Sequence, residues 1–106
     1  MDKEQDKIIP LLKKFKRDIS HKILVDKLIF FGSRARGKAK KMSDIDILLV
    51  SKDFEGKKYF RRSPDFYLMW DYDYDIDIVC LTPGELSKRK KEIGIIGQAL
   101  KEGIEV

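Results

Sequence analysis

The stretch that decides the fold is Gly32-Ser33-Arg34-Ala35-Arg36-Gly37, which six residues separate from Asp44-Ile45-Asp46. Short, mainly apolar runs lie beside both parts, at residues 28–31 and 45–50. Runs of this length bounded by turn residues are typical of buried strands. The sequence therefore predicts one strand that ends at a glycine turn and a second strand that begins with two aspartates.

The glycine turn carries groups that suit phosphate. Gly32 lacks a Cβ, so its backbone can take a positive φ and approach a ligand closely, and backbone amides in such turns bind anions. The hydroxyl of Ser33 is a suitable donor to a phosphate oxygen. Arg34 and Arg36 follow, and guanidinium groups bind phosphate through two hydrogen bonds. An ordinary turn with exposed arginines is the alternative, and we expect Arg34 to lie at the surface.

The aspartates suit a divalent cation. Residues i and i+2 of a strand point to the same face, roughly 6.6 Å apart along it, so Asp44 and Asp46 can share a metal ion. The alternative is that both are merely solvated at an exposed strand end. A third strand is predicted at residues 74–81, where Asp75 and Asp77 fall on one face. Asp77 lies between isoleucines, but the sequence leaves the choice between these two carboxylates open.

The rest of the chain predicts helices and one edge strand. Apolar residues at helical spacing indicate a helix that begins between residues 6 and 10 and ends at Ser20. Residues 57–70 are predicted as a broken helix, and Thr82-Pro83-Gly84-Glu85 is a capping box that starts a helix to about residue 93. A short helix at residues 95–101 and an edge strand at 104–106 complete the pattern. We expect an α/β (α+β) fold with a small mixed sheet, helices mainly on one face and the carboxylates on the other.

The composition sets further limits. The chain has 106 residues, of which 42% are hydrophobic, and this predicts a single domain over residues 1–106. No apolar run reaches the length of a membrane span, no segment of signal-peptide type is present, and Cys80 is the only cysteine. These features predict a cytoplasmic protein. The net charge of +5 comes partly from a basic region within residues 10–41. Aromatic interleaving of the kind seen in stacking platforms is absent from this region, so a nucleic-acid partner is ranked low.

These pieces together resemble the polymerase-β-type nucleotidyltransferase superfamily, and more narrowly its minimal, single-domain members of the MNT/MntA-like antitoxin type. The resemblance rests on Gly32-Ser33, the ten residues before Asp44-x-Asp46, and the later strand around Asp77. It covers the chain from about residue 27 to the end. It implies that Asp44, Asp46 and Asp77 hold two Mg²⁺ ions, with Asp77 also helping to deprotonate an acceptor hydroxyl. It also implies that Gly32, Ser33 and Arg36 bind the triphosphate of ATP.

The resemblance further implies an enzyme that transfers a nucleotidyl group, AMP from ATP, to a hydroxyl acceptor. Larger relatives carry an acceptor-binding domain, so we expect the acceptor here to come from a partner protein or another subunit of a homo-oligomer. A helical partner of the HEPN class, with the chain acting as its antitoxin, is the specific hypothesis. Two alternatives stay open: a non-catalytic nucleotide-binding module that neutralises a partner by occlusion, and a basic RNA-binding domain.

Overall fold

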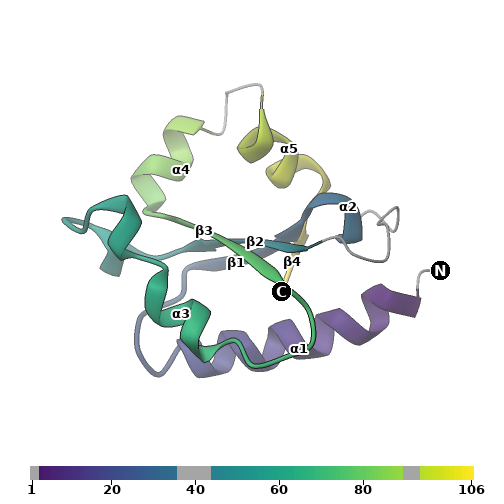
Figure 1. Cartoon of the computed structure of the whole chain (residues 1–106). Helices are drawn as coiled ribbons and strands as arrows, with labels where there is room; N and C mark the ends of the chain where they lie inside the picture. The colour runs from purple at the N-terminus through teal and green to yellow at the C-terminus, as the bar shows by residue number, and fades with distance from the viewer. Residues whose placement is uncertain (1–2, 36–43, 90–93) are drawn as a thin grey trace.

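The protein, a computed structural model that describes residues 3–35, 44–89 and 94–106, contains a four-stranded mixed sheet (Figure 1). The strands are β1 (Lys27–Phe31), β2 (Ile45–Val50), β3 (Ile76–Leu81) and β4 (Ile104–Glu105), in the order β3-β2-β1-β4. β1 is antiparallel to both β2 and β4, whereas β2 and β3 are parallel. The expected mixed sheet and its edge strand at the end of the chain are therefore confirmed.

The helical elements are α1 (Lys3–Ile19), α2 (Gly32–Ala35), α3 (Pro64–Met69), α4 (Pro83–Arg89) and α5 (Ile95–Glu102), with 3₁₀ turns η1 (Lys52–Phe54) and η2 (Tyr59–Arg61). The broken helix is confirmed as η2 followed by α3. The prediction for α1 was wrong at its start, because Pro10 lies inside the helix rather than in its first turn. Burial of its apolar face outweighs the hydrogen bond that proline removes: Ile8, Leu12, Phe15 and Ile19 are all fully buried.

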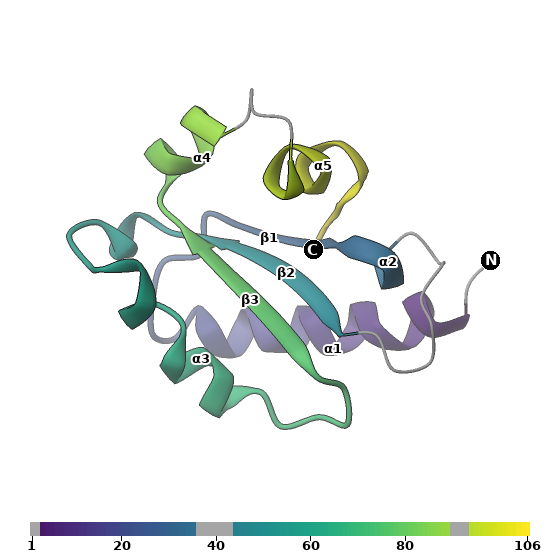
Figure 2. The same cartoon turned by 45° about the horizontal axis from the view of Figure 1, so that its top comes forward.

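Helices cover both faces of the sheet, with α1 and α3 on one side and α4 and α5 on the other (Figures 1 and 2). Side chains along β2 alternate between these layers: Ile45, Ile47 and Leu49 pack in the core that includes α1. Leu48 and Val50 pack in the second cluster, which includes side chains of α4 and α5. By this alternation Asp46 lies on the face opposite α1, as expected for the carboxylates, and α4 and α5 cover another part of that face.

The segment η2–α3 closes the outer edge of β3. The hydroxyl of Tyr67 accepts a hydrogen bond from the backbone N–H of Ile78 at 2.9 Å. The guanidinium of Arg62 donates to the carbonyl of Cys80 at 3.2 Å. The backbone N–H of Ile78 and the carbonyl of Cys80 both point away from β2. The side chains of Tyr67 and Arg62 therefore satisfy polar groups that an open sheet edge would leave available for pairing with another strand.

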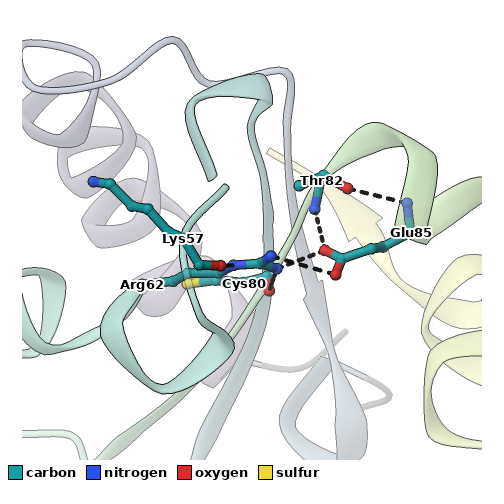
Figure 3. A network of polar contacts seen from close by, with 5 residues as sticks. All are labelled: Lys57, Arg62, Cys80, Thr82 and Glu85. Carbon is teal, nitrogen blue, oxygen red and sulfur yellow. Dashed lines mark hydrogen bonds and ion pairs between the residues drawn. The ribbon is translucent and has the colours of Figure 1, made fainter. Parts of the chain in front are cut away.

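Arg62 also joins this edge to the start of α4 (Figure 3). It is buried, and its guanidinium donates to both carboxylate oxygens of Glu85, at 2.5 and 3.3 Å, and to the carbonyl of Lys57 at 3.1 Å. The Glu85 carboxylate also accepts a hydrogen bond from the backbone N–H of Thr82, and the Thr82 hydroxyl accepts one from the backbone N–H of Glu85. The predicted capping box is therefore confirmed. The hydrogen bonds from Arg62 and then from Thr82 lower the pKa of Glu85 to about 2.

Within the described ranges, no helix is both long enough and apolar enough to span a membrane.

Candidate active site

Asp46 and Asp77 form the centre of the candidate site. They are direct partners in the parallel register of β2 and β3, so both side chains leave the sheet on the same face. Asp46 is half-buried and Asp77 is exposed. Burial, followed by the charges of Asp77 and then Asp44, raises the pKa of Asp46 above its ordinary value of 3.8. Partial burial and the two neighbouring carboxylates therefore both disfavour the charged form of Asp46.

Asp44 and Asp75 lie just outside the paired strands. Asp44 immediately precedes β2 and is exposed, and its charge affects Asp46 less than that of Asp77 does. Asp75 precedes β3 and is also exposed; its carbonyl accepts a hydrogen bond from the N–H of Ile45 at 2.8 Å. The register therefore favours Asp77 over Asp75 as the carboxylate that faces Asp46.

The three predicted carboxylates do not form a closed cluster. Across residues 3–35, 44–89 and 94–106, no group of three or more His, Cys, Asp or Glu side chains is placed to hold a metal ion. The side chains present still fit Mg²⁺, which proteins usually hold through one or two carboxylates completed by water and substrate phosphates. Asp46 and Asp77 would supply those oxygens, with Asp44 beside them. A cation there would offset the neighbouring negative charge that, after burial, raises the pKa of Asp46.

Gly32 connects the phosphate turn to the carboxylates. Its φ is +84°, and a Cβ built on it would lie 2.3 Å from Oδ2 of Asp46. β1 and β2 place it there, because Phe31 pairs with Asp46 at the end of the antiparallel register. The backbone conformation therefore favours glycine, a Cβ here would have to displace the carboxylate of Asp46, and the two halves of the sequence motif are in contact.

We expect Gly32→Ala to destabilise the protein by about 2–3 kcal/mol, since it adds the clash with Asp46 to the cost of roughly 1–2 kcal/mol for a positive φ. Gly56→Ala is the matched control, because Gly56 has a φ of +79° and nothing within 4 Å of a built Cβ. Urea denaturation should show the smaller loss for the control. Equal losses for the two variants would mean that Gly32 does not restrain Asp46.

The other residues of the turn lie in different environments. Ser33 is half-buried in α2, a single helical turn that the sequence did not predict. Arg34 is buried, which corrects the expectation that it is exposed: its guanidinium carbon lies 5.2 Å from the ring centroid of Tyr74. α2 turns the arginine back toward this aromatic ring, where its charge contacts the π face. Arg36 lies outside the described residues, so its role in phosphate binding stays a prediction.

Sequence reasoning missed Tyr67. Its hydroxyl accepts from Ile78 N–H and lies 3.3 Å from Oδ1 of Asp77, to which it can donate. Burial, and to a smaller extent the negative charge of Asp77, raises the pKa of the Tyr67 hydroxyl. The tyrosine therefore restrains the carboxylate that faces Asp46. No spacing rule could have identified it, because α3 and β3 are brought together only by tertiary packing.

We expect Asp77→Asn to lower the pKa of Asp46 in the metal-free protein, since it removes the larger of the two neighbouring charges. The pKa can be followed by carbon NMR of the Asp46 carboxyl group during a pH titration. Asp44→Asn should lower it less. A larger effect from Asp44→Asn would show that the carboxylate of Asp44, not that of Asp77, is the closer neighbour.

Comparison with known proteins shows the family to which the chain belongs. The family model for the nucleotidyltransferase domain matches residues 12–67, more than half of the chain. A Methanocaldococcus jannaschii protein named "putative protein adenylyltransferase MJ0141" is 32% identical over 101 residues, covering 93% of this chain and 98% of that protein. The crystal structure of a Sulfolobus solfataricus protein named "putative nucleotidyltransferase" matches with a TM-score of 0.70 and 25% identity, over 96% of this chain and 81% of that one. The chain belongs to the nucleotidyltransferase domain family.

Proposed function

We propose that the chain transfers AMP from ATP to a hydroxyl acceptor in a Mg²⁺-dependent reaction. The observation that carries the proposal is the pairing of Asp46 with Asp77 beside Gly32. It brings a carboxylate pair suited to metal next to a turn suited to phosphate. The name of the M. jannaschii relative supports adenylyl transfer as the reaction and protein as the acceptor class.

In this reaction the acceptor oxygen forms a bond to the α-phosphorus, and the bond from that phosphorus to the bridging oxygen breaks to release pyrophosphate. Bound Mg²⁺ would offset charge on the triphosphate and lower the pKa of the acceptor hydroxyl. Gly32 and Ser33 would bind the β- and γ-phosphates, together with Arg36. Asp44, Asp46 and Asp77 would hold the cations, and Asp77, which is exposed, would also help to deprotonate the acceptor hydroxyl.

We infer that the acceptor is a side-chain hydroxyl of a partner protein, and a helical HEPN-type partner neutralised by this modification is the specific candidate. The Asp77 side chain is exposed near the start of β3, so a macromolecular hydroxyl can approach it from solvent. We propose that the reaction takes place in the cytoplasm, where ATP is available and where a free cysteine such as Cys80 would stay reduced.

Labelled ATP tests the proposal. With Mg²⁺ and a HEPN-type partner, α-³²P-ATP should label the partner, whose mass should rise by one AMP residue. In contrast, γ-³²P-ATP should leave it unlabelled. Label transferred from the γ position would contradict nucleotidyl transfer, and label found only on a small molecule would contradict the protein acceptor.

The occlusion alternative predicts a different result. If the chain neutralises its partner by binding alone, Asp44→Asn combined with Asp46→Asn should leave neutralisation undiminished. Under the enzymatic proposal, the double variant should bind the partner but fail to neutralise it.

A further inference from the structure

A second surface, at residues 56–61, carries charge that the carboxylate site does not use. A hollow of about 600 Å³ is lined by Gly56, Lys57, Lys58 and Arg61. These three cationic side chains are exposed, and in the part of the chain that the structure describes none of them forms an ion pair with a carboxylate. The hollow therefore presents concentrated positive charge to solvent.

Two aromatic rings lie within this basic segment. Tyr59 is 52% exposed and Phe60 is 67% exposed, although large rings normally bury most of their surface. The guanidinium carbon of Arg61 lies 5.9 Å from the ring centroid of Phe60, so the hollow and the exposed ring are adjacent. Exposed rings between cations combine base stacking with phosphate binding.

Contacts made by Arg62 restrain the surface at residues 56–61. Arg62 donates to the carbonyl of Lys57, which lines the hollow, and is itself fixed by Cys80 and Glu85 (Figure 3). Its guanidinium also lies 5.8 Å from the ring centroid of Tyr59. One buried arginine thus fixes both the backbone of the hollow and one of the two rings. A binding surface restrained in this way loses little conformational entropy when it takes a ligand.

We propose that residues 56–61 bind a single-stranded nucleic acid. The cations would contact successive phosphates, while Phe60 and Tyr59 would stack on bases, which only a single strand offers freely. An acidic protein segment is less well matched, because carboxylates would contact the cations but would leave the exposed rings of Tyr59 and Phe60 without stacking partners. On the sequence, a nucleic-acid partner is ranked low on the basis of the basic region within residues 10–41. The surface at residues 56–61 lies outside that region.

Fluorescence anisotropy with a labelled oligouridylate of about 12 nucleotides tests the proposal. Contacts by three cations predict that log K falls with log salt concentration with a slope of roughly −2 between about 50 and 200 mM KCl. The triple variant Lys57→Glu, Lys58→Glu, Arg61→Glu should abolish measurable binding. The matched control reverses Lys13, Lys14 and Arg17, which are exposed on α1 and give the same change of net charge.

The rings are tested separately. Phe60→Leu keeps an apolar side chain but removes the stacking surface, and the loss of affinity should be about five- to a hundredfold. Thermal unfolding of each variant checks that the fold is intact. Asp46→Asn should leave oligonucleotide binding unchanged, so the loss of this surface is distinguishable from the loss of nucleotidyl transfer.

Four outcomes would overturn the proposal. They are no binding at the lower salt concentration, equal losses from the two triple variants, affinity for a duplex equal to that for the single strand, and equal affinity for a poly-glutamate peptide of the same length. The last result would identify an acidic protein segment as the ligand of this surface.

Discussion

Asp46→Asn should lower the rate of AMP transfer about 10³-fold, because it removes one negative charge from the pair predicted to hold Mg²⁺. Stabilisation by a bound cation is worth several kcal/mol, and each 1.36 kcal/mol corresponds to a factor of ten in rate. Asparagine has nearly the same shape, so the sheet register should persist. Single-turnover transfer of label from α-³²P-ATP, at saturating Mg²⁺, gives the measurement.

The stability of the Asp46→Asn variant shows whether a loss of activity comes from the missing carboxylate or from a damaged fold. The raised pKa of Asp46 means that its charged form is less favourable in the folded than in the unfolded protein. The metal-free protein should therefore gain stability as pH falls through the Asp46 pKa, and Asp46→Asn should unfold at a higher temperature than the wild type at pH 7. A variant that is inactive and also less stable would point to structural damage instead.

Asp75→Asn is the control that decides whether Asp75 or Asp77 acts together with Asp46. Asp77→Asn should lower the rate as strongly as Asp46→Asn does, since the two residues are register partners. Asp75→Asn should stay close to the wild-type rate. The reverse order of effects would identify Asp75 as the carboxylate that acts with Asp46.

Arg62→Met should destabilise the protein by about 2–4 kcal/mol. Removing one partner of a buried ion pair costs about 3–5 kcal/mol, and the Glu85 side chain is 38% exposed, so water recovers part of that loss. The carbonyls of Cys80 and Lys57 also lose their donor. For a chain of this size, the expected fall in melting temperature is roughly 10–20 °C.

Arg61→Met is the matched control, since Arg61 is adjacent but exposed, and it should change stability by no more than about 0.5 kcal/mol.

The pH dependence of the Arg62→Met effect provides a second test of the ion pair. Glu85 has a pKa of about 2 in the fold against 4.5 ordinarily, so its contribution is complete above pH 4.5 and is lost as pH falls toward 2. The difference in unfolding free energy between wild type and Arg62→Met should shrink over that range. A difference that is constant with pH would mean that packing, not the ion pair, stabilises this junction.

The elements that the sequence predicts well are those specified by neighbouring residues. Thr82 and Glu85 form their capping box within one helical turn, and the runs around Gly32 and Asp46 are short enough to identify as strands. The longest helix begins at Lys3 because packing of Leu12 and its neighbours overrides the local effect of Pro10.

Features that depend on contacts between distant segments were beyond the sequence. That Gly32 touches Asp46 follows from the β1–β2 register, and that Tyr67 reaches Asp77 follows from how α3 packs along β3. The exposure of Tyr59 and Phe60 beside cationic side chains is likewise a property of the folded surface, which the sequence did not predict. Motif spacing thus predicted which side chains could form the candidate site, and tertiary structure determined which of them are neighbours.

A crystal of the protein soaked with Mn²⁺ and a non-hydrolysable ATP analogue tests the central claim most directly. We predict anomalous-scattering peaks bound by the carboxylates of Asp46 and Asp77, with the triphosphate against Gly32 and Ser33. Metal bound elsewhere would contradict the account. So would a nucleotide seated in the 310 Å³ cavity lined by Lys27, Lys52 and Leu86 at the other end of β2.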